Sequence, residues 1–195
     1  MLYTHRIDAD GRIVAVDAAW IAFAQRNWRP DFKPALVLGR PLEDFIDGLD
    51  TQAVHRLAAA RVRVRGRGFT LPFRCDSPDL RRFMEMTITP LADGGLEYSC
   101  LLLREEVRAP VPFRPCGPCA VERKLKACSI CLRLERPAWG LLRGQKPAPA
   151  GDAAGTWLEA EQVLPLVAAL EEGYFPPLTY AVCPDCRRAL GVEKA

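Results

Sequence analysis

The cysteines are the residues of this chain whose spacing most clearly predicts chemistry. Six of the eight cysteines lie in three Cys-x-x-Cys pairs, which are Cys116–Cys119, Cys128–Cys131 and Cys183–Cys186. One tight turn can direct two thiols at this spacing toward a single tetrahedral ion. Two such pairs complete the four-thiolate coordination that is typical of structural zinc. We therefore expect the second and third pairs to bind one zinc ion together.

Other interpretations of these four thiols stay open at the level of sequence. An iron–sulfur cluster uses the same four-cysteine ligation, and the spacing does not separate it from zinc. Buried thiols without metal are the remaining alternative. A disulfide framework is disfavoured, because clustered cysteines in a reducing cytosol more often indicate metal or redox chemistry.

The first pair, Cys116-Gly117-Pro118-Cys119, has the tetrapeptide of the thioredoxin active site. It lacks the preceding tryptophan and the βαβ setting, so thioredoxin-like catalysis is disfavoured. A helix beginning near Ala120 would place Cys119 at a helix N-terminus, where the thiol pKa falls. The pair is thus a candidate redox switch or a source of additional metal ligands, with a structural pair of thiols as the alternative.

Composition narrows the classes of function. The chain has 195 residues, 49% of them hydrophobic, and a formal net charge of +3. This length suits one large or two small domains, and the small charge gives no argument for nucleic acid. The sequence shows neither an 18-residue apolar run nor a leader pattern, so we expect no membrane segment and a cytoplasmic location. No kinase, cyclase or phosphatase motif is visible, and we expect no enzyme activity.

The first half of the chain alternates strand and helix signals. Asp8–Gly11 has the residues of a tight turn, and Asp17 is placed to cap a helix. A longer helix should follow Asp50, with Val54, Leu57, Ala58 and Val62 on its buried side. From Phe69 the period changes to two, typical of strands. The predicted order is two strands, several short helices and three antiparallel strands ending near Leu103.

This order resembles a PAS sensor domain over roughly residues 3–107. The residues that carry the likeness are Ile7–Val14, Asp17–Trp20, Leu38-Gly39-Arg40-Pro41-Leu42 and the closing strands. The resemblance implies an α+β fold, a PAS-like antiparallel sheet with short helices, that holds a small molecule between the middle helices and the sheet or docks a protein partner or second copy. We expect one core with contributions from Phe23, Leu42, Phe45, Leu57, Met86 and Leu102.

The last third of the chain is similar to a tetracysteine module found on bacterial PAS and response-regulator proteins. The matching segments are Cys128–Cys131, Gly155–Glu159 and Leu178–Cys186. The resemblance implies a bacterial signalling protein with three parts: a sensor domain at 1–107, a proline-rich connector at 108–127 and a small metal-stabilised module at 128–195. Within the module, the spacing of Thr156 and Glu159 predicts a capping box and a helix beginning at Trp157.

His55 is the remaining candidate ligand. It falls on the predicted long helix, close to where haem-binding PAS sensors place their axial histidine. A single histidine on an amphipathic helix is more often a boundary residue, so haem is the disfavoured alternative. The sequence therefore predicts a regulatory protein that couples ligand or partner sensing to a zinc module. A thiol-based redox sensor, or one containing an iron–sulfur cluster or haem, is the alternative.

Overall fold

The computed structural model describes residues 1–27, 29–111, 124–137, 155–166 and 176–191. The chain divides into two compact units. Unit 1 comprises Met1–Ser77 and Arg81–Glu106, and unit 2 comprises Pro78–Leu80 and Val107–Ala195. Cys116 and Cys119 lie outside the described residues, so the prediction for this pair stays a prediction. Within the described ranges, no helix is both long and apolar enough to cross a membrane.

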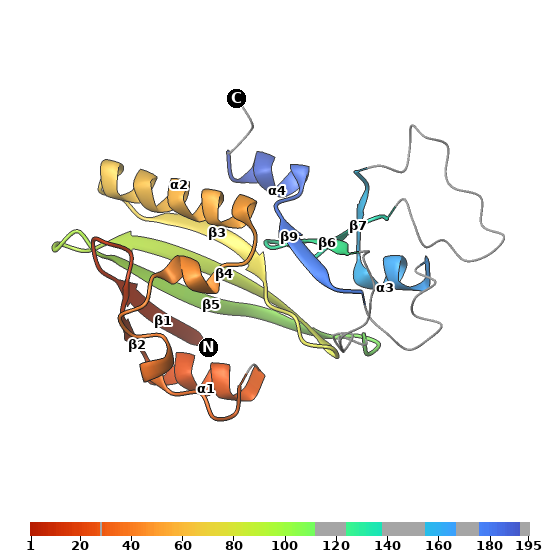
Figure 1. The fold of residues 1–195 in the computed structure, drawn as a ribbon, viewed down its shortest axis with the longest axis horizontal. Coiled ribbons are helices and arrows are strands. Elements are labelled where there is room, and N and C mark those ends of the chain that lie inside the picture. The colour runs from red at the N-terminus through yellow and green to blue at the C-terminus, as the bar shows by residue number, and fades with distance from the viewer. Residues whose placement is uncertain (28, 112–123, 138–154, 167–175, 192–195) are drawn as a thin grey trace. The chain divides into compact units, whose positions relative to one another are not determined.

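Unit 1 is built on a five-stranded sheet of β1 (Leu2–Ile7), β2 (Ile13–Val16), β3 (Phe69–Arg74), β4 (Leu80–Pro90) and β5 (Leu96–Val107). The strand order is β2-β1-β5-β4-β3, and β1 pairs antiparallel with both β2 and β5. The chain between β2 and β3 forms α1 (Ala18–Asn27), the 3-10 helices η1 (Pro34–Leu36) and η2 (Leu42–Phe45), and α2 (Leu49–Arg65) (Figure 1). The predicted order of elements and the PAS-like α+β fold are confirmed.

Local interactions explain why the first helix begins where it does. The Trp20 N–H donates to Asp17 Oδ1 at 2.6 Å, as expected of an N-cap. The other carboxylate oxygen accepts from the Thr4 N–H at 2.8 Å and so ties the start of α1 to β1. The turn before β2 also forms as predicted, with Gly11 at φ +81° and its N–H donating to the Asp8 carbonyl at 3.1 Å.

Helix α2 turns a small-residue face inward. Val54, Ala58 and Val62 are buried at a spacing of four residues, as predicted. The prediction for Leu57 is wrong, because this side chain is 52% exposed. Consecutive residues are separated by about 100° around a helix, so Leu57 is rotated away from the face that Ala58 occupies. Gly66, at φ +59°, ends the helix in the left-handed conformation.

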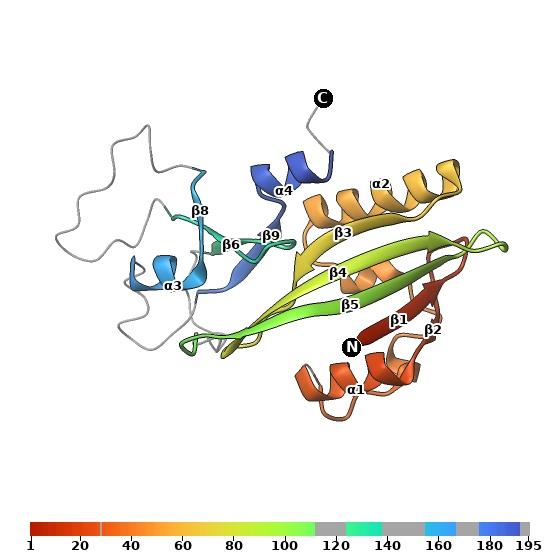
Figure 2. The same cartoon turned by 180° about the vertical axis from the view of Figure 1, so that it is seen from behind.

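The core of unit 1 lies between the sheet and these helices. Tyr3, Met84 and Cys100 form a buried cluster, and α1 covers it with Trp20 and Phe23. Met86 and Leu102 also pack against this cluster, so the predicted core positions Phe23, Met86 and Leu102 are confirmed. The last two predicted positions, Leu42 and Phe45, line a cavity instead. Figure 2 shows the same sheet from behind.

Unit 2 has a smaller sheet, with the order β8-β7-β6-β9. Its elements are β6 (Leu125–Cys128), β7 (Leu134–Glu135), β8 (Trp157–Leu158), α3 (Ala160–Val163), η3 (Leu164–Leu166), β9 (Leu178–Ala181) and α4 (Pro184–Ala189). Leu125, Leu134 and Val163 are at most 2% exposed and belong to one buried cluster. The four strands of this sheet are only two to four residues long.

The predicted helix start at Trp157 is wrong. Trp157 instead pairs with Glu135 in the sheet, and α3 begins three residues later at Ala160. The capping box joins Glu159 to Gln162, whose side chain accepts from the Glu159 N–H at 3.1 Å. A capping box requires an acceptor at the N-cap and an acid or amide three residues on, and both windows supply this pattern. Because Trp157 pairs in the sheet, the helix begins within the second of these two windows, Glu159–Gln162.

Candidate metal centre

The second and third cysteine pairs, Cys128–Cys131 and Cys183–Cys186, meet because β6 and β9 are parallel neighbours. Their register runs from Leu125 opposite Leu178 to Cys128 opposite Ala181. Parallel strands end at the same edge of a sheet, so the turn after β6 and the helix start after β9 emerge side by side. The Ser129 N–H donates to the Ala181 carbonyl at 2.9 Å and fastens one turn to the other.

Each pair is shaped by a different local structure. Cys128 ends β6, and the Leu132 N–H donates back to its carbonyl at 2.9 Å to close the turn. Leu132 has φ +57°, a left-handed conformation that is uncommon for a branched residue. Cys183 is the N-cap of α4, and Pro184 occupies the first turn, where its missing N–H costs nothing.

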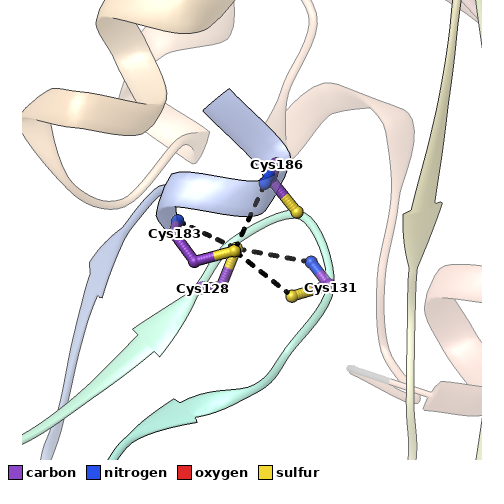
Figure 3. A group of neighbouring side chains, drawn as sticks. All are labelled: Cys128, Cys131, Cys183 and Cys186. Carbon is purple, nitrogen blue, oxygen red and sulfur yellow. Dashed lines mark hydrogen bonds between the residues drawn. The ribbon is translucent and has the colours of Figure 1, made fainter. Parts of the chain in front are cut away.

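The four thiols converge on one point, as Figure 3 shows. The sulfurs of Cys128, Cys131, Cys183 and Cys186 all lie within 4.8 Å of one another. Cys128 and Cys183 are fully buried, whereas Cys131 and Cys186 are partly exposed. The structure thus brings together all four residues that the sequence predicts as ligands.

Backbone N–H groups are directed at the sulfurs. Cys128 Sγ accepts from the N–H of Cys131 at 3.5 Å and from that of Cys183 at 3.4 Å. Cys183 Sγ accepts from the N–H of Cys186 at 3.4 Å. Hydrogen bonds of this kind favour thiolates over thiols, and thiolates are the form that binds metal.

Hydrogen bonds between the sulfurs move the pKa values of the cluster thiols apart. Hydrogen bonds from the side chains of Cys131 and Cys186 hold the pKa of Cys128 well below its ordinary value. The same hydrogen bonds raise the pKa of Cys131 to about 12 and also raise that of Cys186, because each donates its proton to a neighbouring sulfur. A metal cation would replace these protons as the positive charge at the centre.

The dimensions of the cluster fit a tetrahedral ion. Zinc–sulfur bonds of about 2.3 Å place the sulfurs of a regular tetrahedron about 3.8 Å apart. The sulfurs of Cys131 and Cys183 are separated by 3.8 Å. Near the cluster, Arg133 lies 3.5 Å from Glu159 and 3.6 Å from Asp185, measured between nitrogen and oxygen. The donor set and its spacing therefore fit a closed four-thiolate metal site.

A second candidate site lies within unit 1 and was missed by sequence reasoning. His5, on β1, is 8% exposed, and neither of its ring nitrogens has a hydrogen-bond partner in the described structure. Its ring stacks on Tyr98 with centroids 4.7 Å apart. A single histidine within a strand has no spacing pattern, so only the tertiary structure distinguishes it.

The ring of His55 also stacks on Tyr98. Its ring centroid is 6.1 Å from that of Tyr98, and its Nδ1 is buried without a partner among the described residues. Burial lowers the pKa of His55, opposed in part by Glu43. The adjoining cavity measures about 190 Å³, which is below the range of about 300–1,000 Å³ usual for drug-sized ligands. Haem is larger still, so this geometry does not favour it.

No protein-family model matches the chain, and no curated protein matches it. Among solved structures it is similar to a domain of an HTR-like protein from Haloarcula marismortui, with 12% identity and a TM-score of 0.39 over 53% of this chain and 98% of that one. It is also similar to a sensory box sensor histidine kinase from Vibrio cholerae, with 11% identity and a TM-score of 0.38 over 53% and 82% of the two chains. The strand order, rather than these scores, defines the PAS-like architecture.

Proposed function

We propose that the chain is a non-enzymatic signalling protein of the bacterial cytoplasm in which a PAS-like sensor unit is coupled to a zinc-stabilised module. The observation that carries the proposal is the convergence of four thiols within 4.8 Å of one another at the end of a small sheet. Such a closed four-cysteine site leaves no open position for a substrate, which is the arrangement of structural zinc.

The role of zinc in this proposal is to crosslink two segments that are distant in sequence. Cys128 ends β6 and Cys131 follows it, while Cys183 caps α4 and Cys186 lies in its first turn. The strands β7, β8 and β9 between the two pairs are only two to four residues long. Metal binding supplies folding free energy that a small core lacks. An iron–sulfur cluster is the alternative at the same four residues.

In the sensor unit we propose binding of a small molecule inside the fold and association through the sheet. The inner cavity supports the first activity, together with its histidine, which has no hydrogen-bond partner within the part of the chain that the structure describes. Exposed leucines on strands β1 and β5 support docking of a protein partner or a second copy, since Leu2 is 51%, Leu101 38% and Leu103 56% exposed. Leu2 and Leu101 are cross-strand neighbours, so they lie on one face.

The test is metal analysis with an absorption spectrum on protein purified without oxygen. We expect about one zinc per chain and no visible absorbance. Broad brown absorbance would instead identify an iron–sulfur cluster, and a Soret band would identify bound haem. The Cys183→Ser, Cys186→Ser double variant should lose the metal, whereas Cys75→Ser, at a cysteine outside the cluster, should retain it. Full metal content in the double variant would contradict the assignment.

A further inference from the structure

A cavity of about 260 Å³ lies between β1, β2 and the short helices of unit 1. Its walls are formed by His5, Ile13, Val16, Trp20, Val37, Leu42 and Phe45. Every lining residue except His5 is apolar or aromatic. The Trp20 ring packs edge-on against Phe32, with centroids 5.2 Å apart, so the aromatic wall is held in place by the surrounding core.

His5 is the polar feature of this cavity. Both of its ring nitrogens are buried, and neither has a hydrogen-bond partner among the described residues. An imidazole in this state carries a free-energy penalty, since buried polar groups in folded proteins are almost always hydrogen-bonded. Asp17, the acid whose charge acts on His5, already accepts from the Trp20 and Thr4 N–H groups. A molecule in the cavity can remove the penalty by pairing with the imidazole.

The charge of His5 restricts the class of molecule. Burial, followed by the proximity of His55, lowers the pKa of His5 to about 4, with Asp17 acting weakly in the opposite direction. The imidazole is therefore neutral at pH 7 and offers one donor and one acceptor. An anionic ligand would be buried beside a neutral ring within apolar walls, which is unfavourable.

The size of the cavity restricts the ligand further. A dry apolar cavity of about 150 Å³ accommodates one benzene ring, so 260 Å³ suits a fused two-ring molecule. We propose that this cavity binds a small, uncharged, planar aromatic molecule whose single hydrogen-bonding group pairs with the imidazole of His5. The inference rests on the proposed sensor function and names the class of ligand for it.

Indole and indene make a matched pair of probes. They have the same fused-ring shape, but only indole has an N–H that can donate to His5. Binding of each to the full-length protein would be measured by calorimetry at pH 7.5, with ¹⁵N-histidine NMR to follow the ring nitrogens. We expect indole to bind at least tenfold more tightly than indene, and the His5 nitrogen resonances to shift with indole alone.

Two variants test separately the hydrogen bond to His5 and the use of the cavity as the binding site. His5→Phe keeps an aromatic ring against Tyr98 but removes both nitrogens, so indole and indene should bind within about twofold of each other. Val16→Phe fills the cavity from β2 and should weaken both probes. Thermal melting of each variant verifies that unit 1 is folded, and metal content of the same samples reports separately on the cysteine cluster.

The outcomes are distinct. Equal binding of indole and indene to the unmodified protein would overturn the role of His5 while leaving ligand sensing by unit 1 in place. Binding that Val16→Phe leaves unchanged would place the probes elsewhere and overturn the cavity as their site. Absence of binding of both probes at millimolar concentration would overturn the inference as a whole.

Discussion

At the scale of single residues, Cys128 is the cysteine with the most connections in the cluster. Its sulfur accepts N–H groups from both turns, those of Cys131 and Cys183, and the residue is fully buried. Removal of this sulfur therefore affects both halves of the site. A serine oxygen is a poor substitute, because structural zinc sites are built from thiolates and imidazoles.

We accordingly predict that Cys128→Ser lowers metal content from about one ion per chain to a small fraction of that value. The folding free energy that the metal supplies to unit 2 is lost with it. Cys100→Ser is a matched control, since Cys100 is also buried but belongs to the core of unit 1. It should destabilise unit 1 and leave metal content unchanged. Equal metal loss in both variants would show that the effect is not specific to the cluster.

The second prediction at this scale concerns pH. The pKa of His5 falls from 6.5 to about 4 on folding, chiefly because of burial. Between these two values the unfolded chain binds more protons than the folded chain. The contribution of His5 to the free energy of unfolding is therefore fully present above about pH 6.5 and is lost as pH falls toward 4. The shift corresponds to about 3.4 kcal/mol at most. His55 contributes in the same direction.

Urea unfolding of the unmodified protein and His5→Phe at pH 7.5 and pH 5 would measure this effect. The stability difference between the two proteins should change by about 1–2 kcal/mol in favour of the variant at the lower pH. Other titrating groups are common to both proteins and cancel in the comparison. A pH-independent difference would mean that His5 does not titrate with folding.

Residue types differ in how well sequence predicts their role. The four cluster cysteines were identifiable because Cys-x-x-Cys is a local pattern with a direct chemical meaning. His5 was not, since its significance depends on Tyr98 and on a cavity formed by residues from several elements. Burial of a single polar side chain is a property of tertiary structure and leaves no periodic signal.

At the scale of elements, α2 illustrates how narrow the buried face of a helix is. Val62 is completely buried, whereas Val64, two residues later, is 87% exposed. Positions two apart point to different sides of a helix. The two valines thus form a matched pair with the same residue type, the same helix and opposite environments.

We predict that Val62→Asp lowers the free energy of unfolding of unit 1 by more than about 3 kcal/mol, because it buries an unpaired carboxylate. Val64→Asp should change it by less than about 0.5 kcal/mol. Denaturant unfolding followed by circular dichroism would distinguish the two. Similar stabilities for both variants would contradict the rotation of α2 about its axis that buries Val62 and exposes Val64.

The elements were predicted to different extents for physical reasons. The order of strands and helices in unit 1 followed from changes in hydrophobic period. The pairing of Trp157 with Glu135 and the parallel alignment of β6 with β9 did not, because each joins segments that are separated in sequence. The parallel alignment is also what brings the two cysteine pairs together, so the sequence predicted the ligands without the element that positions them.

At the scale of the whole molecule, the two units differ in what stabilises them. Unit 1 has a five-stranded sheet and a core that includes Tyr3, Met84 and Cys100. Unit 2 combines a four-stranded sheet of very short strands with the cysteine cluster. Ligand binding to the folded form alone raises stability in proportion to the logarithm of ligand concentration. Metal should therefore govern the stability of unit 2 far more than that of unit 1.

The last prediction is that a strong chelator selectively unfolds unit 2 in the full-length protein. Hydrogen exchange followed by mass spectrometry would report on each element, since amide protection reflects local opening free energies. Amides of β6 and β9 should lose protection, while those of β1 and β5 keep theirs. Added zinc should restore protection, and the chelator should have little effect on the exchange pattern of the Cys183→Ser, Cys186→Ser variant, which already lacks the metal. Simultaneous loss of protection in β1 and β6 would instead show that the metal stabilises the molecule as one cooperative unit, because separate units would open at different chelator concentrations.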